Sequence, residues 1–479
     1  MIGDQTVFRN IVFDILLLAF AILLITSPVW FDLKDITYDI GGIVDYANRN
    51  LIPHNISDYW LLIPIGIIGV WRWSVWTIKK IISLGYSPIA LPAADKNSSY
   101  SLKKPSMSII TPVYNEDPKI FRLGLESWWK NRPSEIIAVI DRSDINCIKE
   151  FEDFQIGKAN VILIVTSKPG KRAALVDGIL KAKGEIIALT DSDTIWDKDV
   201  RENALAPFIV NPKIGGVTPR YHPISRNSIW QKMNDIFWDM RNYYDMPAQS
   251  AAGNAVSCIS GKTAFYRRDI LLPKIDAFLN EVILDRKKES GEDKCLTRLV
   301  QSNGWKSQYQ SNAVIYSSAA YDFRTFINQR LRWSRNSHNS DFISLWDGWA
   351  WSHPFLAFCM LDRFISTFTL FLGPIFFSLA LYQNQWLLAT TIIILWIVGR
   401  GIKIFPHIKR YPKDVIILPV YILISFLIAL TKLYALVTIR DQHVIRGKNV
   451  KRKLFKRVKN FILTGEIIFG IFLFAALLH

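Results

Sequence analysis

The sequence predicts a mixed, mainly parallel α/β domain inserted between α-helical membrane segments. From about residue 83 to residue 341, short Ile- and Val-rich runs alternate with helical stretches, which is the rhythm of a parallel sheet. Apolar runs long enough to cross a bilayer stand before and after this stretch. We therefore expect two membrane helices in residues 1–82, the α/β domain in residues 83–341, and interfacial and membrane helices in residues 342–479.

The composition supports this division into domains and argues against some classes of binding partner. Half of the 479 residues are hydrophobic, and the formal net charge is +17. The Lys and Arg residues gather beside apolar runs, most densely in residues 446–459, as they do at the cytosolic flanks of membrane helices. We therefore expect no nucleic-acid partner. The four cysteines show no paired spacing, so the sequence predicts neither a disulfide framework nor a zinc site.

The first two membrane segments set the expected orientation. They cover residues 11–30 and about 59–78, and the second ends in Lys79 and Lys80. The loop between them is rich in Asp and poor in cations, so the positive-inside rule places that loop outside and the α/β domain in the cytosol. A cleaved signal peptide is the alternative for the first segment, but no small-residue cleavage site follows it. The prediction is a multi-pass protein of the cell membrane.

Apolar runs resume after the α/β domain. Residues 361–382 and 386–398 are joined by so short a loop that a helical hairpin is expected. Before them, residues 342–360 carry widely spaced aromatic side chains, which suit an amphipathic helix lying in the membrane interface.

The last part of the chain presents a topological choice. Residues 415–437 are long enough to cross, but crossing would place the basic stretch 440–459 outside, against the positive-inside rule. We therefore expect a re-entrant or interfacial segment there, with a simple crossing as the alternative. A final span is expected near residues 461–478.

Carboxylates follow three of the predicted strands, which cover residues 106–113, 136–140, 161–165 and 186–189. Glu116 follows the first strand, Asp141 and Asp144 the second, and Asp191 and Asp193 the fourth. Ligands of such sheets bind at the carboxyl ends of the strands, so these side chains are candidates for a common site. A single aspartate at a strand end is commonly a helix cap or turn former, and this alternative stays open for Asp144.

Two features near the fourth strand favour a phosphate-bearing ligand. Asp191 and Asp193, with the small Ser192 between them, can both reach one hard divalent ion, which completes its shell with substrate phosphates. Upstream, a Gly-led turn delivers Lys171 and Arg172 to the start of a helix, where cations and the helix amino end both favour phosphate oxygens. A solvated basic turn is the alternative for this second feature.

Three further motifs follow in order, Ser260-Gly261-Lys262, Gly291-Glu292-Asp293-Lys294 and Gln329-Arg330-Leu331-Arg332-Trp333. Together with the motifs above and the flanking spans, they closely resemble the membrane-integrated family 2 glycosyltransferases, which include hyaluronan, nodulation chitooligosaccharide, chitin and cellulose synthases. The resemblance covers most of the chain. Residues 291–313 and 418–439 look most like the hyaluronan synthase branch.

This resemblance implies a GT-A type fold and an inverting, metal-dependent, processive enzyme that polymerises a UDP-sugar and translocates the polysaccharide. It implies nucleotide-sugar binding by Pro112, Tyr114, Glu116, Asp141, Lys171, Arg172 and Asp191, with Mg²⁺ or Mn²⁺ held by Asp191 and Asp193. Asp293 would be the general base that deprotonates the acceptor hydroxyl. The acceptor would meet Ser260, Gly261, Lys262, Glu292, Gln329, Arg332 and Trp333, with the indole stacked on the terminal sugar.

Other interpretations stay open at this stage. Arg332 and Trp333 also suit a membrane interface, and Asp293 also suits a salt-bridged surface acid. Many hyaluronan synthases have SGP where this chain has SGK, and they carry a WGTR-like segment where residues 441–447 contain no Trp. Both departures leave acceptor specificity and gating open.

Competing functions are a nonprocessive enzyme that adds one sugar to a lipid, as ceramide glucosyltransferases do, and a noncatalytic carrier. The expected partners are a UDP-sugar donor, a growing polysaccharide chain and membrane lipid. The sugar and the oligomeric state are not predicted.

Overall fold

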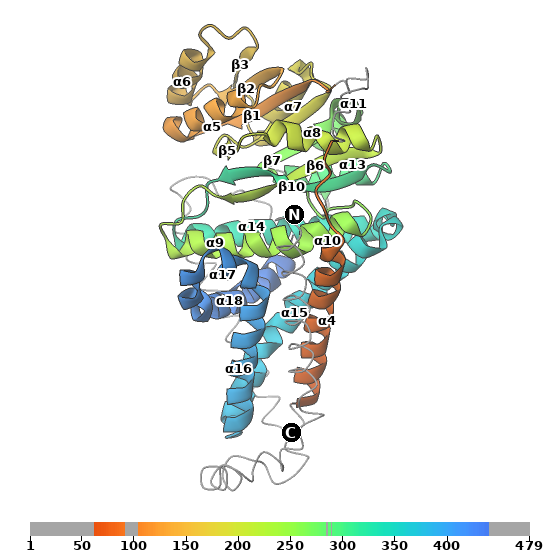
Figure 1. Cartoon of the computed structure of the whole chain (residues 1–479), viewed down its shortest axis with the longest axis vertical. Helices are drawn as coiled ribbons and strands as arrows, with labels where there is room; N and C mark the ends of the chain where they lie inside the picture. The colour runs from red at the N-terminus through yellow and green to blue at the C-terminus, as the bar shows by residue number, and fades with distance from the viewer. Residues whose placement is uncertain (1–61, 92–103, 284–285, 289, 440–479) are drawn as a thin grey trace, which may run out of the picture.

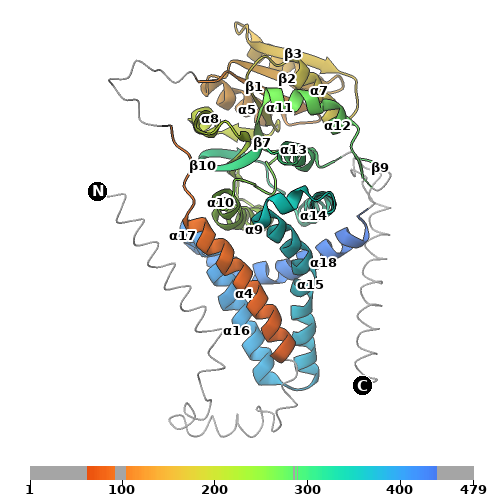
Figure 2. The same cartoon turned by 90° about the vertical axis from the view of Figure 1, so that its right-hand side faces the viewer.

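The structure is a computed structural model that describes residues 62–91, 104–283, 286–288 and 290–439. An α/β domain lies at one end of an elongated molecule, and long helices extend from it at the other end (Figures 1 and 2). Helix α4 (Leu62–Leu84) leads into this domain, and α15 (Pro354–Tyr382) and α16 (Trp386–Lys403) lie beyond it in the chain. The predicted segments at residues 11–30, 440–459 and 461–478 lie outside the described residues.

The domain is built on one eight-stranded sheet in the order β3-β2-β1-β4-β7-β6-β10-β5. Its strands are β1 (Met107–Val113), β2 (Glu135–Asp141), β3 (Val161–Thr166), β4 (Ile186–Thr190), β5 (Thr194–Trp196), β6 (Ile214–Pro223), β7 (Thr263–Arg267) and β10 (Lys306–Ser317). Strands β1 to β4 are parallel neighbours, and β6 is parallel to β10. Strand β7 is antiparallel to β4 and β6, and β5 is antiparallel to β10. The predicted mixed, mainly parallel sheet is confirmed, and the four predicted strands are β1 to β4.

Helices cover both faces of the sheet because successive strand residues point to opposite sides. Ile109 belongs to one hydrophobic core, with Phe121 and Trp128, whereas Ile110 belongs to the other, with Tyr266. The helices are α5 (Pro118–Lys130), α6 (Ile145–Gln155), α7 (Lys171–Lys181), α8 (Val200–Val210), α11 (Arg268–Leu271), α12 (Ile275–Leu279) and α13 (Glu292–Gln301). A short ribbon, β8 (Val282–Ile283) with β9 (Arg286–Lys287), completes the domain.

Two strand-end aspartates begin helices. Asp117 accepts hydrogen bonds from the backbone N–H groups of Lys119 and Ile120, and Asp144 accepts one from Cys147. Such caps satisfy amide donors that have no partner inside the helix. The helix-cap alternative for Asp144 is therefore confirmed.

Helices that lie across the underside of the α/β domain separate it from the long helices (Figures 1 and 2). They include α9 (Ile229–Met240), a π-helical turn (Arg241–Asp245), α10 (Met246–Ala251), α14 (Phe323–Trp346) and α17 (Phe405–Arg410). Lys79 of α4 pairs with Asp245 of the π-helical turn (3.2 Å) and with Asp362 of α15 (3.3 Å). This ammonium thereby joins three elements that are distant in sequence.

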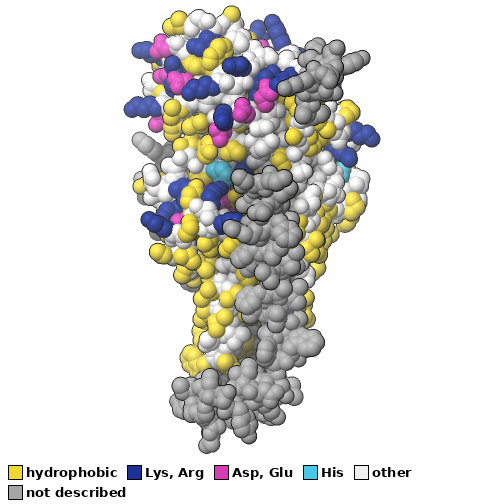
Figure 3. Space-filling model, in the orientation of Figure 1, with side chains coloured by type: hydrophobic (Ala, Val, Ile, Leu, Met, Phe, Trp, Pro, Cys, Tyr) yellow, Lys and Arg dark blue, Asp and Glu magenta, His cyan; other side chains and the backbone are white. Residues whose placement is uncertain are grey.

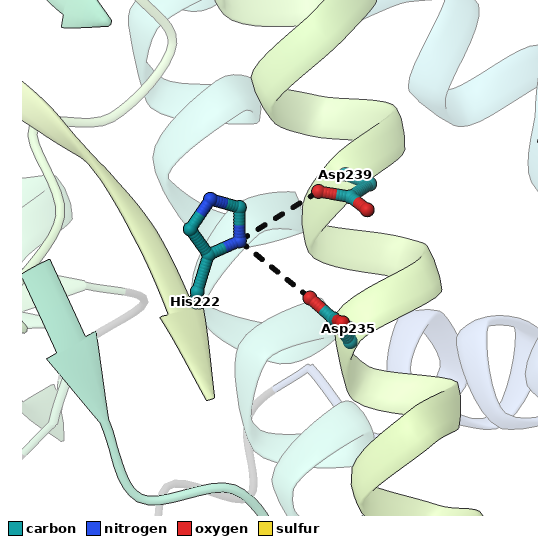
Figure 4. A group of neighbouring side chains, drawn as sticks. All are labelled: His222, Asp235 and Asp239. Atoms are coloured by element: carbon teal, nitrogen blue, oxygen red, sulfur yellow. Dashed lines mark ion pairs between the residues drawn. The ribbon is translucent and has the colours of Figure 1, made fainter. Parts of the chain in front are cut away.

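A second charged cluster fixes α17 to α9. His222, Asp235 and Asp239 converge from β6 and α9 (Figure 4). The Arg410 guanidinium lies among them, with its nitrogens 2.7 Å from Asp235 Oδ1 and 3.1 Å from Asp239 Oδ1. The buried His407 ring adds a contact of 2.7 Å from Nδ1 to Asp239 Oδ2. The group could offer ligands to a metal ion, but Arg410 already supplies the positive charge that its carboxylates require.

Among the residues that the structure describes, three helices are long and apolar enough to cross a membrane, namely Pro354–Tyr382, Trp386–Lys403 and Pro412–Val437. The first two form the expected hairpin. Apolar side chains cover the lower part of the molecule, whereas charged side chains gather on the α/β domain (Figure 3). The third consists of a 3-10 turn (Pro412–Ile417) and α18 (Leu418–Val437). Helix α18 runs across the direction of α15 and α16 (Figures 1 and 2), which favours the re-entrant or interfacial alternative.

The prediction of an amphipathic helix over residues 342–360 is wrong about its continuity, because these residues do not form one helix. Helix α14 runs to Trp346, a 3-10 turn covers Trp349–Ser352, and α15 begins at Pro354. Gly348 adopts a φ of 80°, and Pro354 starts a new helix. A left-handed glycine and a following proline are the usual signals for ending one helix and starting the next.

Replacing Arg410 by Met should destabilise the junction. The change removes a cation shared by Asp235 and Asp239, and we expect a loss of about 1–3 kcal/mol, because Asp235 keeps its pair with Arg226 but Asp239 keeps only its contact with His407. Unfolding in detergent, followed by tryptophan fluorescence, measures the loss. Lys409→Met alters the exposed neighbour and is the control. Equal effects in the two variants would contradict the structural role of Arg410.

Candidate active site

A pocket of about 400 Å³ lies at the carboxyl ends of β1 to β4. It is lined by six of the seven residues predicted to bind the nucleotide sugar, Pro112, Tyr114, Glu116, Asp141, Lys171 and Asp191, and also by Asp193. Gly170, with a φ of 98°, precedes the first residue of α7, so the amino end of this helix faces the pocket. Helix amino ends favour anions, and a phosphate-bearing ligand fits this wall.

The acidic wall of the pocket carries carboxylates that repel one another. Burial raises the pKa of Asp193, and the charge of Asp191 raises it further. Burial also raises the pKa of Glu116, whose Oε2 accepts a hydrogen bond of 2.7 Å from Ser192. A divalent cation would relieve this repulsion, and oxygen ligands are those that Mg²⁺ and Mn²⁺ prefer. Asp191 and Asp193 therefore fit the predicted metal.

Lys171 links the acidic wall to a second acidic motif. Its Nζ lies 2.6 Å from Asp191 Oδ1 and 2.7 Å from Glu292 Oε1. Burial opposes ionisation of Glu292, but the adjacent Lys171 outweighs this and lowers the pKa of Glu292 to about 2. A small adjoining pocket is lined by Asp191, Glu292 and Asp293 together. The structure thus brings Asp191, one of the two predicted metal ligands, and the predicted base to one pocket.

Asp293 lies in the first turn of α13 and is held by its surroundings. Its Oδ1 accepts a hydrogen bond of 2.8 Å from the Lys294 backbone N–H, and its Oδ2 accepts one of 3.4 Å from the Cys258 thiol. Gly291 begins the helix in the left-handed region, and a Cβ at this position would meet the Asn336 side chain of α14 at 2.9 Å. A glycine here allows the acidic turn to sit directly against α14.

The SGK motif approaches the same turn from β7. A Cβ on Gly261 would lie 3.4 Å from Asp293 Cβ, and the Lys262 carbonyl accepts the Asp191 backbone N–H at 3.0 Å. Ser260 accepts a weak hydrogen bond, 3.4 Å long, from the Lys262 backbone. The motif therefore lies between the predicted metal ligands and the predicted base.

The remaining predicted residues are placed differently. Arg172 is buried away from the pocket lining, and its guanidinium contacts Glu281 at 2.6 Å and the Phe278 carbonyl. Gln329, Arg332 and Trp333 lie on α14. The charge of Arg332 acts on both Glu292 and Lys262, whereas Trp333 packs against the hydrophobic core and stacks near Arg330.

Sequence patterns did not identify several contributors. Ser192, Cys258 and Trp238 each contact a site residue, namely Glu116, Asp293 and Lys262. Cys258 lies two positions before the SGK motif, and Trp238 lies near the carboxyl end of α9, so neither carries a motif of its own. Only Ser192, inside the DSD motif, had a signal that could have been used.

Comparison with known proteins identifies the class. Residues 105–336 match the family described as "Glycosyltransferase like family 2". The chain therefore carries a family 2 glycosyltransferase domain and is a glycosyltransferase. The predicted GT-A type α/β fold is confirmed.

Particular relatives extend the match beyond this domain. A type 2 glycosyltransferase of Zymoseptoria tritici is 27% identical over 80% of this chain and 82% of its own length. A hyaluronan synthase of Streptococcus pyogenes is 25% identical, covering 82% of this chain and 92% of its own. An N-acetylglucosaminyltransferase of Sinorhizobium fredii is 26% identical over 64% and 74%. A Pyrobaculum calidifontis mannosyltransferase, solved with GDP-Man and Mn²⁺, has a TM-score of 0.46 at 17% identity, covering 71% of this chain and 97% of that chain.

The Lys171 bridge yields a coupling prediction. Lys171→Met should destabilise the protein because it leaves Asp191 and Glu292 unpaired, and adding Glu292→Gln should recover part of that loss. A double-mutant cycle in chemical unfolding should give a coupling of roughly 0.5–3 kcal/mol. Lys168→Met, which removes a largely exposed pair with Asp177, is the control and should have little effect. Additive effects of Lys171→Met and Glu292→Gln would argue against the bridge.

Proposed function

We propose that this glycosyltransferase is an inverting, metal-dependent, processive polysaccharide synthase that uses a UDP-sugar on the cytosolic side of the cell membrane. The observation that carries the proposal is the single acidic site in which Asp191 faces both the large pocket and Asp293. A donor pocket and a candidate base that share one wall suit direct transfer between two substrates. The motif order and the similarity to a hyaluronan synthase support the polymerising activity.

The large pocket would hold the nucleotide. Tyr114, Glu116 and Asp141 line its outer part and would meet the uracil and ribose. Lys171 and the amino end of α7 would meet the diphosphate, because both favour phosphate oxygens. Arg172 would support this wall from behind through its ion pair with Glu281, rather than by touching the ligand.

Asp191 and Asp193 would hold Mg²⁺ or Mn²⁺, which when bound stabilises negative charge on the departing diphosphate. The group of His222, Asp235 and Asp239 is not assigned this role because Arg410 lies among its carboxylates. Asp293 would accept the proton of the acceptor hydroxyl as that oxygen attacks the anomeric carbon. The contacts that Asp293 receives from Lys294 and Cys258 leave its carboxylate fixed in orientation.

The acceptor would enter from the α14 side, bordered by Ser260, Gly261, Lys262, Glu292, Gln329, Arg332 and Trp333. Helix α14 lies between strands β1 to β4 and the long helices α4, α15 and α16 (Figures 1 and 2). A growing chain that leaves the acceptor site would therefore pass toward membrane lipid, and we propose that these helices border its exit.

Asp293→Asn should reduce sugar transfer by about 10²–10⁴-fold, because the amide cannot accept the proton. UDP binding should change little, since Asp293 does not line the large pocket. Activity and UDP titration in nanodiscs measure the two effects separately. Asp276→Asn, on the exposed face of α12, is the control. Wild-type turnover in Asp293→Asn would remove this residue from the base role.

Removal of divalent metal should abolish transfer, and added Mn²⁺ or Mg²⁺ should restore it. Asp193→Asn should weaken Mn²⁺ binding measured by electron paramagnetic resonance, because one of two carboxylate ligands is lost. Asp235→Asn, in the arginine-filled cluster, should leave Mn²⁺ binding unchanged. Unchanged Mn²⁺ binding in Asp193→Asn, with weakened binding in Asp235→Asn, would instead place the metal in the cluster of His222, Asp235 and Asp239.

Product length tests the proposal directly. The purified full-length protein in nanodiscs would be incubated with single UDP-sugars and with pairs, and its products sized by gel filtration. Long polymers are expected with at least one donor combination. A lipid that carries a single sugar, with every combination, would refute processive synthesis and favour the ceramide glucosyltransferase-like alternative.

A further inference from the structure

A buried group of charges joins the acidic turn of α13 to α14 and α15. The Lys294 Nζ donates a hydrogen bond of 2.9 Å to the Ser257 carbonyl and lies 3.4 Å from Asp341 Oδ1 of α14. The other oxygen, Asp341 Oδ2, accepts a hydrogen bond of 2.5 Å from Arg363 Nε of α15. Lys294 and Asp341 are both buried, so solvent screens their attraction only weakly.

The carboxylate of Asp341 is the centre of this group. Burial opposes its ionisation, but the charges of Arg363 and Lys294 outweigh burial and lower the pKa of Asp341. A buried ion pair often adds little stability relative to well-packed apolar side chains. It does fix where the segments that carry it lie, because moving either segment leaves a buried charge without its partner.

The segments fixed in this way are the two that contact the proposed base. Asp293 Oδ1 accepts the Lys294 backbone N–H at 2.8 Å, and Asp293 Oδ2 accepts the Cys258 thiol at 3.4 Å. The first donor belongs to Lys294 itself, and the second follows Ser257, whose carbonyl the Lys294 ammonium holds. One ammonium thus anchors both donors to the Asp293 carboxylate, and Asp341 anchors that ammonium.

We propose that Asp341 is a positioning residue that, through Lys294, holds the Asp293 carboxylate in the orientation needed to accept the proton of the acceptor hydroxyl. The inference rests on the proposed function, in which Asp293 is the base. A base that is held less firmly costs reaction rate rather than donor affinity, because other residues line the nucleotide pocket. Since Arg363 belongs to α15, the same contacts attach a candidate membrane helix to the catalytic turn.

Asp341→Asn and Lys294→Met test this role in the full-length protein in nanodiscs, with each UDP-sugar that supports transfer by the wild type. Each variant should lower kcat by roughly 10–100-fold, because a displaced catalytic group loses its alignment. The donor KM and the Kd for UDP should stay near the wild-type values. Lys294→Arg keeps a cation that can pair with Asp341 and should retain most of the wild-type kcat.

A double variant and a control separate positioning from a general structural effect. Combining Asp341→Asn with Lys294→Met should be no slower than the slower single variant, because both changes remove the same contact. Asp347→Asn alters an exposed aspartate just after α14 and should match the wild type.

The outcomes distinguish this inference from the proposed function. Wild-type kcat in Asp341→Asn and Lys294→Met, with transfer lost in Asp293→Asn, would overturn the positioning role and leave the base in place. Wild-type kcat in Asp293→Asn would instead refute the base role itself. Should Asp341→Asn lose UDP binding through misfolding, the two Lys294 variants decide, and equal kcat in Lys294→Arg and Lys294→Met would overturn the proposal.

Discussion

The structure depends on the convergence of negative charge at one sheet edge. Parallel strands bring their carboxyl ends together, so Glu116, Asp191 and Asp193 meet although they are far apart in the chain. Such a group is unstable without counter-charge, because burial and then the neighbouring charge of Asp191 raise the pKa of Asp193. Lys171 supplies part of that charge and extends the network to Glu292. The repulsion among the carboxylates thus also gives the site its affinity for cations. Lys171 and a bound cation in turn favour a diphosphate.

The sequence was sufficient where chemistry and periodicity coincide. Strands β1 to β4 are rich in Ile and Val, and four of the five carboxylates that follow them line one pocket, whereas Asp144 caps a helix. Strands β5, β6, β7 and β10 were not predicted, because their residues mix polar and apolar types and pair across long separations, such as β6 with β10. Long-range pairing of this kind leaves no local pattern.

The direction in which a side chain points was the second property that the sequence could not predict. Lys171 and Arg172 are adjacent and chemically alike, yet the first faces the pocket and the second pairs with Glu281 behind it. Successive helix positions point about 100° apart, so one of two neighbouring cations on α7 had to face elsewhere. Only the position of α12 and the Glu281 segment decides which one. The Cys258 contact with Asp293 could not be predicted for the same reason, because it depends on how the segment before β7 lies against α13.

The charged contacts at the junction have a mechanical consequence. Lys79 joins α4 to α15 and to the turn before α10, and Arg410 with His407 joins α17 to α9. These attachments lie on separate elements, so a movement of α4 and α17 away from α9 and the π-helical turn would have to break several ion pairs at once. A rigid-body movement of these helices relative to one another is therefore disfavoured. Under the proposed function, the growing chain would then have to move past these helices while the helices keep their positions.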